Sequence, residues 1–212
     1  MAILDDISIA VQAGKKKDVE ALVQQALDEG VSAKDILEGG LLAAMDIIGP
    51  KFKNNEIFVP EVLVAARAMN TGTALLKPHL AAAGTGSRGK AVIGTVKGDM
   101  HDIGKNLVRM MIEGKGIEIE DLGVDVAPEV FVEYLKAHED VTLVCFSALL
   151  TTTLPALEQS VKAIVDASLH DRVKILVGGA PVTTEYAEQI GADGYSPDAG
   201  SAAAKAAELI AS

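Results

Sequence analysis

The sequence predicts an N-terminal all-α four-helix bundle, followed by a flavodoxin-like (Rossmann-like) α/β domain with a doubly wound, five-stranded parallel sheet. Before residue 85, apolar residues recur at three- and four-residue steps, which is typical of amphipathic helices, and strand patterns are absent. After residue 90, short apolar runs alternate with helical stretches, as in parallel sheets covered on both faces. A Gly/Ser-rich segment, Gly84–Gly89, separates the two patterns. We therefore expect a helical domain at residues 1–84, a linker at 85–90 and an α/β domain at 91–212.

The predicted helices of the N-terminal domain span Ile3–Val11, Asp18–Leu27, Ser32–Ile48 and Pro60–Ala83. Ser32, followed three residues later by Asp35, resembles a capping box in which Asp replaces the usual Glu or Gln. The helix that it opens is expected to end before Gly49-Pro50. Pro60 suits the first helical position, and Pro78 is expected to bend or interrupt the last helix. Helices of this kind predict a small bundle.

Strands and helices alternate in the second half of the chain. The strands are expected at residues 91–96, 117–122, 141–146, 173–177 and 193–195, and the helices at 103–114, 128–138, 154–168, 182–190 and 199–211. Five parallel strands fit the flavodoxin-like order, in which ligands bind beyond the C-terminal ends of the strands at the point where the strand order reverses. A binding site is therefore expected at this edge.

Composition limits the classes of partner. The 212 residues carry a formal net charge of −11 and no basic stripe, so nucleic acid is not an expected partner. The one cysteine, Cys145, lies in an apolar run and is interpreted as a small buried hydrophobe, and a chain without a disulfide framework fits a reducing compartment. No apolar run approaches the length of a membrane span, and no signal-peptide pattern is present. We expect a cytoplasmic protein with no membrane partner.

The segment Asp99-Met100-His101-Asp102-Ile103-Gly104 carries the strongest chemical signal. It follows the first predicted strand. An Asp two residues before a His at such a strand end can hold one imidazole nitrogen, which leaves the other nitrogen for a metal. Gly104 allows a large flat cofactor to approach the backbone. The pattern predicts a histidine metal ligand with its own orienting carboxylate.

Unusual residues also follow the other predicted strands. Ser147–Thr153 follows the third strand, Gly178-Gly179 follows the fourth, and Tyr195–Asp198 lies at the fifth. One cofactor that lies across this edge can contact all of these loops. Taken alone, Gly178-Gly179 is an ordinary strand-to-helix turn. The other histidines of the chain are expected at the surface: His79, His138 and His170.

Together these motifs resemble the fingerprint of the cobalamin-binding family. The matching residues are Asp99-x-His101-x-x-Gly104, Ser147-x-Leu149 and Gly178-Gly179. The stretch from Gly94 to Asn106 looks like the corresponding region of methionine synthase and of the corrinoid proteins of methyltransferase systems. The family's helical cap is similar to Gly40–Met45, Gly49, Phe52 and Phe58–Val62. The resemblance covers nearly the whole chain and points to the stand-alone corrinoid proteins.

The resemblance implies a role for each matched residue. His101 is the expected lower axial ligand to cobalt, in place of the dimethylbenzimidazole base of the cofactor (the base-off, His-on mode). Asp99 accepts the hydrogen bond from the other ring nitrogen, and Thr153 stands where methionine synthase has a serine that completes this relay. The other residues expected to bind the cofactor are Gly98, Met100, Asp102, Ile103 and Gly104 in the first loop, Ser147, Leu149, Thr151, Gly178 and Gly179 along the nucleotide tail, Tyr195 and Ser196 at the fifth strand, and Met45, Phe52, Val59 and Val62 over the upper face.

The implied function is that of a methyl carrier. The cobalt of cobalamin or a related corrinoid cycles between nucleophilic Co(I) and a methyl-Co(III) state such as methylcobalamin. The implied partners are a substrate-specific methyltransferase, a methylcorrinoid:tetrahydrofolate or thiol methyltransferase, and a reductive activase. The chain lacks a substrate barrel, so it is expected not to be an enzyme on its own. The methyl donor (methylamine, methanol, betaine or an aryl methyl ether), the acceptor and the exact corrinoid are left open.

Other functions fit the sequence less well. A B12-dependent sensor or regulator is the main alternative, but such proteins add a DNA-binding domain or a Trp in the cap, and this chain has no Trp. The small subunit of an adenosylcobalamin mutase typically lacks the helical cap. A phosphoryl-accepting receiver needs an Asp at the end of the third strand, where Phe146-Ser147 stands. Dinucleotide binding is not expected, because no Gly-x-Gly-x-x-Gly follows the first strand.

Overall fold

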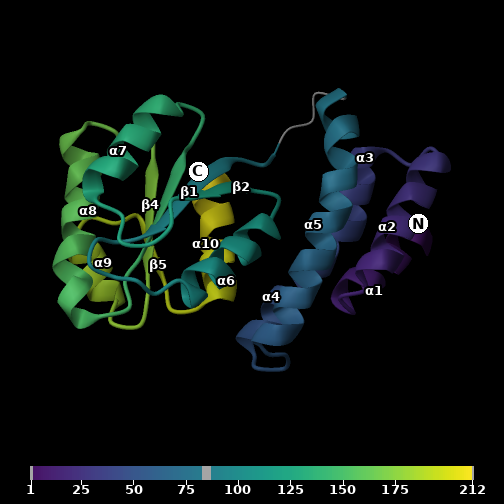
Figure 1. Cartoon of the computed structure of the whole chain (residues 1–212), viewed down its shortest axis with the longest axis horizontal. Coiled ribbons are helices and arrows are strands. Elements are labelled where there is room, and N and C mark those ends of the chain that lie inside the picture. Colours follow the sequence, from purple (N-terminus) through teal and green to yellow (C-terminus); the bar gives the residue numbers. More distant parts are fainter. Residues whose placement is uncertain (1, 83–86, 212) are drawn as a thin grey trace. The chain divides into compact units, whose positions relative to one another are not determined.

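The computed structural model describes residues 2–82 and 87–211, and it contains a helical unit and an α/β unit (Figure 1). Each unit is compact by itself. The expected helix end at Ala83 and the first positions of the expected linker lie outside the described residues. None of the helices within the described ranges is both long and apolar enough to cross a bilayer.

The helical unit consists, within residues 2–82, of α1 (Ala2–Gln12), α2 (Lys16–Asp28), α3 (Ala33–Asp35), the π-helical segment η1 (Ile36–Leu42), α4 (Ala43–Lys53) and α5 (Val59–Ala82). The N-terminal cap of α3 confirms the predicted capping residue, since Ser32 Oγ accepts a hydrogen bond from the Asp35 N–H at 3.1 Å. The helices share an aliphatic core that includes Ile7, Val23, Ile36, Leu41 and Met69. Burial of this core stabilises the unit by the hydrophobic effect.

Two helix boundaries in this unit differ from the prediction. The helix expected over Ser32–Ile48 is divided by η1, where a side chain on Gly40 would come within 2.9 Å of Ile7 Cγ2, so the glycine allows α1 to approach closely. The expected end before Gly49-Pro50 is wrong, because α4 continues through Pro50 to Lys53. Proline removes one intrahelical hydrogen bond, and the buried apolar face of α4 outweighs that loss. The helix α5 also continues past Pro78, to Ala82, so the expected interruption at this proline is absent.

The α/β unit has a five-stranded parallel sheet within residues 87–211, with the strand order β2-β1-β3-β4-β5. Its strands are β1 (Lys90–Thr95), β2 (Glu118–Asp121), β3 (Leu143–Ser147), β4 (Lys174–Gly178) and β5 (Gly194–Ser196). Its helices are α6 (Ile103–Glu113), α7 (Pro128–Ala137), α8 (Leu154–Asp166), α9 (Thr184–Gln189) and α10 (Ala199–Ala211), with the 3-10 turn η2 (Thr151–Thr153) before α8. This architecture confirms the predicted flavodoxin-like fold, whose strand order reverses between β1 and β3.

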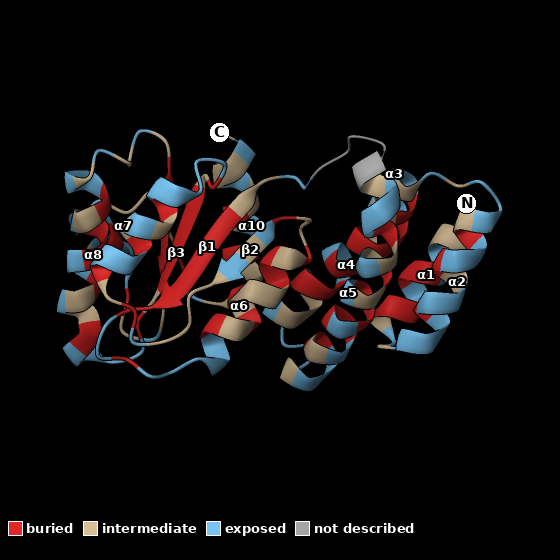
Figure 2. Ribbon diagram, turned by 45° about the horizontal axis from the view of Figure 1, so that its top comes forward, coloured by how far each residue is buried: buried red, intermediate tan, exposed pale blue. Residues whose placement is uncertain are grey.

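Helices cover both faces of this sheet. Figure 1 shows α7, α8 and α9 on one face and α6 and α10 on the other. The central strands β1 and β3 are almost entirely buried (Figure 2). On the α7 face, the rings of Phe131 and Phe146 meet edge to face with centroids 4.7 Å apart. A side chain on Gly94 would come within 2.6 Å of the Phe131 ring, so this glycine makes room for the aromatic pair.

Cys145 lies in β3, is fully buried, and has a thiol pKa that burial raises to about 12. The thiolate is the reactive form, so this thiol is expected to react only when the chain unfolds. An aromatic disulfide reagent at mildly alkaline pH should label native protein at the rate of unfolding, and should label protein in concentrated guanidinium chloride at once. Rapid labelling of the native protein would contradict the buried position.

Candidate functional site

The register of the sheet aligns small and hydroxyl-bearing residues at its C-terminal edge. Thr95 pairs with Ser147, Ser147 pairs with Gly178, and Gly178 pairs with Ser196 across neighbouring strands. The four strands at whose ends the sequence predicts site residues, β1, β3, β4 and β5, are therefore aligned in one row. The loops after β1 and β3 flank the point where the strand order reverses, which is the usual ligand position in this fold.

Asp99, in the loop after β1, organises the centre of the site. Its side chain is fully buried. Oδ1 accepts the His101 N–H at 3.1 Å and lies 2.7 Å from His101 Nδ1. Oδ2 accepts the backbone N–H of Leu149 at 2.7 Å and the hydroxyl of Thr153 at 3.0 Å. Oδ1 is thus held from the loop after β1, and Oδ2 is held from the segment after β3. The hydroxyl of Thr153 contacts Asp99, as expected from the resemblance to methionine synthase.

These hydrogen bonds keep the Asp99 carboxylate ionised in spite of its burial. Burial alone would raise the pKa of Asp99, but the Leu149 N–H, the His101 ring and N–H, and the Thr153 hydroxyl all favour the charged form and lower the pKa to about 2. A depressed folded-state pKa stabilises the protein above the ordinary carboxyl pKa of 3.8, and this contribution is lost as the pH falls through about 2.

Replacing Asp99 by Asn in the cofactor-free protein should therefore destabilise the α/β unit in a pH-dependent way. The difference in free energy of unfolding between wild type and Asp99→Asn is expected to be largest above pH ~4 and to shrink towards pH ~2, where the wild-type carboxylate is protonated as well. Urea unfolding at a series of pH values measures this difference. A difference that stays constant over this range would contradict the ionised, hydrogen-bonded carboxylate.

His101 presents one ring nitrogen to its surroundings. Its side chain is half exposed, and Nδ1 is engaged by Asp99. None of the described residues hydrogen-bonds Nε2. A carboxylate on Nδ1 favours the tautomer in which that nitrogen carries the proton, which leaves the Nε2 lone pair available to a metal. The contact predicted from the two-residue spacing of Asp99 and His101 is present.

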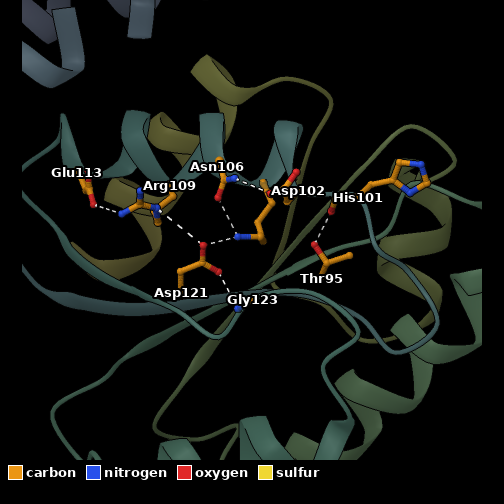
Figure 3. Close-up of polar contacts among 9 residues, drawn as sticks. Thr95, His101, Asp102, Asn106, Arg109, Glu113, Asp121 and Gly123 are labelled. Carbon is orange, nitrogen blue, oxygen red and sulfur yellow. Dashed lines mark hydrogen bonds and ion pairs between the residues drawn. The ribbon is translucent and has the colours of Figure 1, made fainter. Parts of the chain in front are cut away.

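The backbone on the C-terminal side of His101 is anchored by residues that sequence reasoning missed. Thr95 Oγ1 donates to the carbonyl oxygen of His101 at 2.8 Å (Figure 3). Buried Lys105, on the first turn of α6, pairs with Asp121 at the end of β2, and Asp121 also accepts the Gly123 N–H at 2.9 Å (Figure 3). A hydroxyl residue at the last position of a buried strand was the available sequence signal for Thr95. Lys105 gave no comparable signal, because its partner is 16 residues away.

The surroundings of His101 fit a large, flat and mainly apolar group. Met100 and Ile103 are exposed on either side of it, at 68% and 80% of their full surface, and Leu149 is also exposed. Exposed apolar side chains grouped in this way are typical of a ligand-binding surface. A Cβ added at Gly104 meets nothing within 4 Å, so there is open space next to the backbone there. One nitrogen ligand within an apolar surface suits a metal whose other ligands come from its own macrocycle.

The remaining predicted site residues occupy several positions. Gly98 and Asp102 are exposed in the first loop, and Asp102 Oδ2 accepts a hydrogen bond from Asn106 on α6 at 3.2 Å. Thr151 is exposed in η2, and Ser147 is partly buried. Gly178 is the last residue of β4, next to Ser196 O, and Gly179 follows it beside the backbone of Ala148. Two predicted residues lie in β5: Ser196 is buried, and Tyr195 packs against the core that includes Phe131.

Four predicted residues belong to the helical unit. Val62 is fully buried in α5 and Met45 is buried in α4. Phe52 and Val59 are partly exposed, in α4 and at the start of α5. Phe52 and Val59 therefore have free surface for a ligand, whereas Val62 contributes to the helical core.

The chain is similar along most of its length to proteins that bind cobalamin or carry corrinoids. A B12 binding domain model matches residues 89–204, and a second B12 binding domain model matches residues 3–77. Dimethylamine corrinoid protein 3 of Methanosarcina acetivorans is 41% identical over 98% of this chain and 97% of its own length.

Two solved structures extend this similarity to three dimensions. A cobalamin-binding protein from Desulfitobacterium hafniense aligns with a TM-score of 0.80 and 27% identity, over 97% of this chain and 98% of its own. A chain of the methanol:cobalamin methyltransferase complex MtaBC from Methanosarcina barkeri aligns with a TM-score of 0.87 and 26% identity, over 99% of this chain and 80% of its own.

Proposed function

Because the chain belongs to the family of B12-binding corrinoid proteins, we propose that it carries a methyl group on the cobalt of a bound corrinoid between two partner methyltransferases. When bound, the corrinoid supplies a cobalt atom that takes up a methyl group in its Co(I) state and returns it. The observation that carries the proposal is the buried Asp99 carboxylate 2.7 Å from His101 Nδ1, with Nε2 left without a partner among the described residues.

The residues of the chain have distinct tasks in this proposal. His101 provides Nε2 as the lower axial ligand, in the base-off, His-on mode. Asp99 holds the ring through Nδ1 and can retain a proton there when the ligand leaves the cobalt, while Thr153 and the Leu149 N–H orient the carboxylate. A His ligand would favour the higher oxidation states of a bound cobalt, and loss of this ligand would favour Co(I). The hydrogen bonds around Asp99 therefore set how readily the His101 imidazole would bind to cobalt and leave it.

The other residues provide the surface on which the cofactor rests. Met100, Ile103 and Leu149 offer apolar contacts to a corrin ring. Small residues at the ends of β3 and β4 and just beyond them are proposed to leave room for the displaced nucleotide tail: Ser147, Thr151, Gly178 and Gly179. Phe52 and Val59 are proposed to cover the upper face and to keep water from the reacting carbon. The buried positions of Met45 and Val62 give them a supporting role behind this surface.

The proposed partners are a substrate-specific methyltransferase that loads the carrier, a second methyltransferase that passes the group to tetrahydrofolate or a thiol, and a reductive activase that restores Co(I). The chain is then the cofactor-carrying component of a multi-subunit system in the cytoplasm. The relative named for dimethylamine makes methylated amines the first donors to test. In this scheme the partner enzyme determines which methyl donor is used. The donor is therefore identified by assaying the carrier with the methyltransferase encoded next to it, on a panel of donors that also contains methanol, betaine and an aryl methyl ether.

Titration of the purified protein with methylcobalamin tests the proposal. The expected absorption spectrum is that of cobalamin with its dimethylbenzimidazole displaced and a histidine on cobalt. An unchanged base-on spectrum of the cofactor, or the absence of binding, would overturn the proposed function. Retention of adenosylcobalamin in preference to methylcobalamin would indicate a mutase subunit or a regulator instead.

Gly104→Ala is expected to weaken cofactor binding without destabilising the fold. A Cβ at Gly104 meets no protein atom within 4 Å, and Ala is a better helix former than Gly near the start of α6. The free energy of unfolding without cofactor is expected to stay level or to rise by up to about 1 kcal/mol. The added methyl group occupies space proposed for the corrin ring, so the dissociation constant for methylcobalamin should rise by about tenfold, which corresponds to about 1.4 kcal/mol. Calorimetric titration and thermal unfolding measure the two quantities, and an unchanged affinity would remove Gly104 from the site.

A further inference from the structure

We propose that Asp125, in the loop between β2 and α7, is a positioning residue that holds the turn carrying Asp99 and His101 in the geometry needed for axial ligation. The inference rests on the proposed function and deepens it. Asp125 lies outside the motifs that drew attention to the site, and it acts on the metal ligand only through other residues.

The loop that contains Asp125 runs beside the exit of β1. The Thr95 N–H donates to Gly123 O at 3.0 Å, and the Val126 N–H donates to Thr95 O at 3.0 Å. A further parallel bridge pairs Val96 with Val126. These bonds fix the loop against β1 at the point where the chain turns towards His101.

Asp125 extends this attachment to the turn itself with two hydrogen bonds. Its N–H donates to Asp99 O at 2.9 Å. Its Oδ1 accepts the Gly98 N–H at 2.7 Å. The two bonds hold main-chain groups on both sides of the Asp99 Cα. They limit rotation of the segment from which the Asp99 side chain reaches His101 Nδ1, which is 2.7 Å away.

Both residues at this contact have a left-handed backbone conformation. Asp125 has a left-handed conformation with φ +54°, and Gly98 has φ +82°. A non-glycine residue in this region is uncommon, and it persists where surrounding contacts over-determine it, often at functional sites. The left-handed conformation at Asp125 allows both its N–H and its carboxylate to reach the same turn. The Asp125 side chain is exposed, so the fold does not depend on burying it.

Two substitutions isolate the side-chain contact. Asp125→Gly keeps easy access to the left-handed backbone and removes the acceptor for the Gly98 N–H. Asp125→Asn keeps both features, because Asn tolerates this conformation and its amide oxygen can accept the same bond. Thermal unfolding of the cofactor-free proteins is expected to show midpoints within a few degrees of wild type for both variants.

Electron paramagnetic resonance of the cob(II)alamin-loaded proteins, prepared with nitrogen-15 histidine, reports the fraction of cobalt bound to the protein imidazole. Asp125→Gly should shift the equilibrium between ligated and unligated histidine by about tenfold towards the unligated form, as expected for loss of one charge-assisted hydrogen bond. Its Co(II)/Co(I) midpoint potential should become less negative, because loss of the ligand favours Co(I). Asp125→Asn should stay within about twofold of wild type in the same equilibrium.

Wild-type ligation in Asp125→Gly would overturn the positioning role while leaving the proposed function intact. A loss in Asp125→Asn as large as that in Asp125→Gly would overturn it too, since the acceptor would then not be what matters. Failure of wild-type protein itself to ligate cobalt through histidine would overturn both the proposed function and this inference.

Discussion

Replacing His101 by alanine is expected to abolish coordination of cobalt by the protein while corrinoid binding persists in weakened form. His101 Nε2 has no hydrogen-bond partner among the residues that the structure describes, and its ring is held by the buried Asp99 carboxylate 2.7 Å from Nδ1. The apolar residues around it and the loops after β3 and β4 do not depend on the imidazole. The absorption spectrum of bound cobalamin should therefore change from the histidine-ligated form to one without any lower nitrogen ligand, and binding should remain measurable by titration.

His79→Ala is the matched control, because His79 is an exposed histidine near the C-terminal end of α5. This variant should bind cobalamin with an unchanged spectrum. Histidine ligation that survives in His101→Ala, or that is lost in His79→Ala, would contradict the assignment of the axial ligand. Complete loss of cofactor binding in His101→Ala, in a protein that still unfolds cooperatively, would mean that the apolar surface contributes less to binding than proposed.

Gly179→Ala is expected to be the most damaging single methyl addition at the edge of the sheet. Gly179 has φ +127°, and a Cβ there would lie 1.8 Å from Ala148 O and 2.7 Å from Ala148 C. These are backbone atoms, so the clash is relieved only by moving the chain after β3 or β4. We expect the free energy of unfolding to fall by about 2 to 5 kcal/mol, from the strained backbone and the overpacking together.

Gly179→Ala should also disturb the proposed metal site, because Ala148 is directly bonded to a residue that holds Asp99. Ala148 precedes Leu149, whose N–H holds the Asp99 carboxylate at 2.7 Å. Movement of Ala148 is therefore expected to weaken histidine ligation as well as stability, and chemical denaturation with a cobalamin titration measures both. Gly191→Ala is the control: Gly191 has φ +82° with no atom within 4 Å of the added Cβ, and it should lose only about 1 to 2 kcal/mol from the backbone term. Equal losses in the two variants would contradict the close contact at Ala148.

Local sequence patterns account for most of the fold. The apolar runs of β1 and β3 are buried on both faces, so they can be recognised without knowing their neighbours. Boundaries that depend on tertiary burial were harder to predict, and α4 is the clearest case. A proline followed the expected helix end, yet burial of the residues before it carries the helix on to Lys53.

At the candidate site, contacts between residues close in sequence could be predicted and contacts between distant ones could not. The Asp99–His101 hydrogen bond follows from a spacing of two residues. The Thr153–Asp99 bond spans 54 residues and was expected only through the resemblance to methionine synthase. Asp125 is 27 residues from its partner Gly98, and an Asp after a strand is too common to single out. Its contact with Gly98 can be recognised only when β1 and β2 are placed side by side in the sheet.

The source of the nitrogen bound to cobalt distinguishes ligation by His101 from ligation by the cofactor's own base. Cob(II)alamin bound to protein labelled with nitrogen-15 histidine should show an electron paramagnetic resonance spectrum in which each cobalt line is split into a doublet by the labelled imidazole, and His101→Ala should remove that splitting. A triplet from nitrogen-14, unaffected by the label, would mean that the cofactor keeps its own base on cobalt. That result would contradict the assignment of His101 and the base-off, His-on mode on which the proposed function rests.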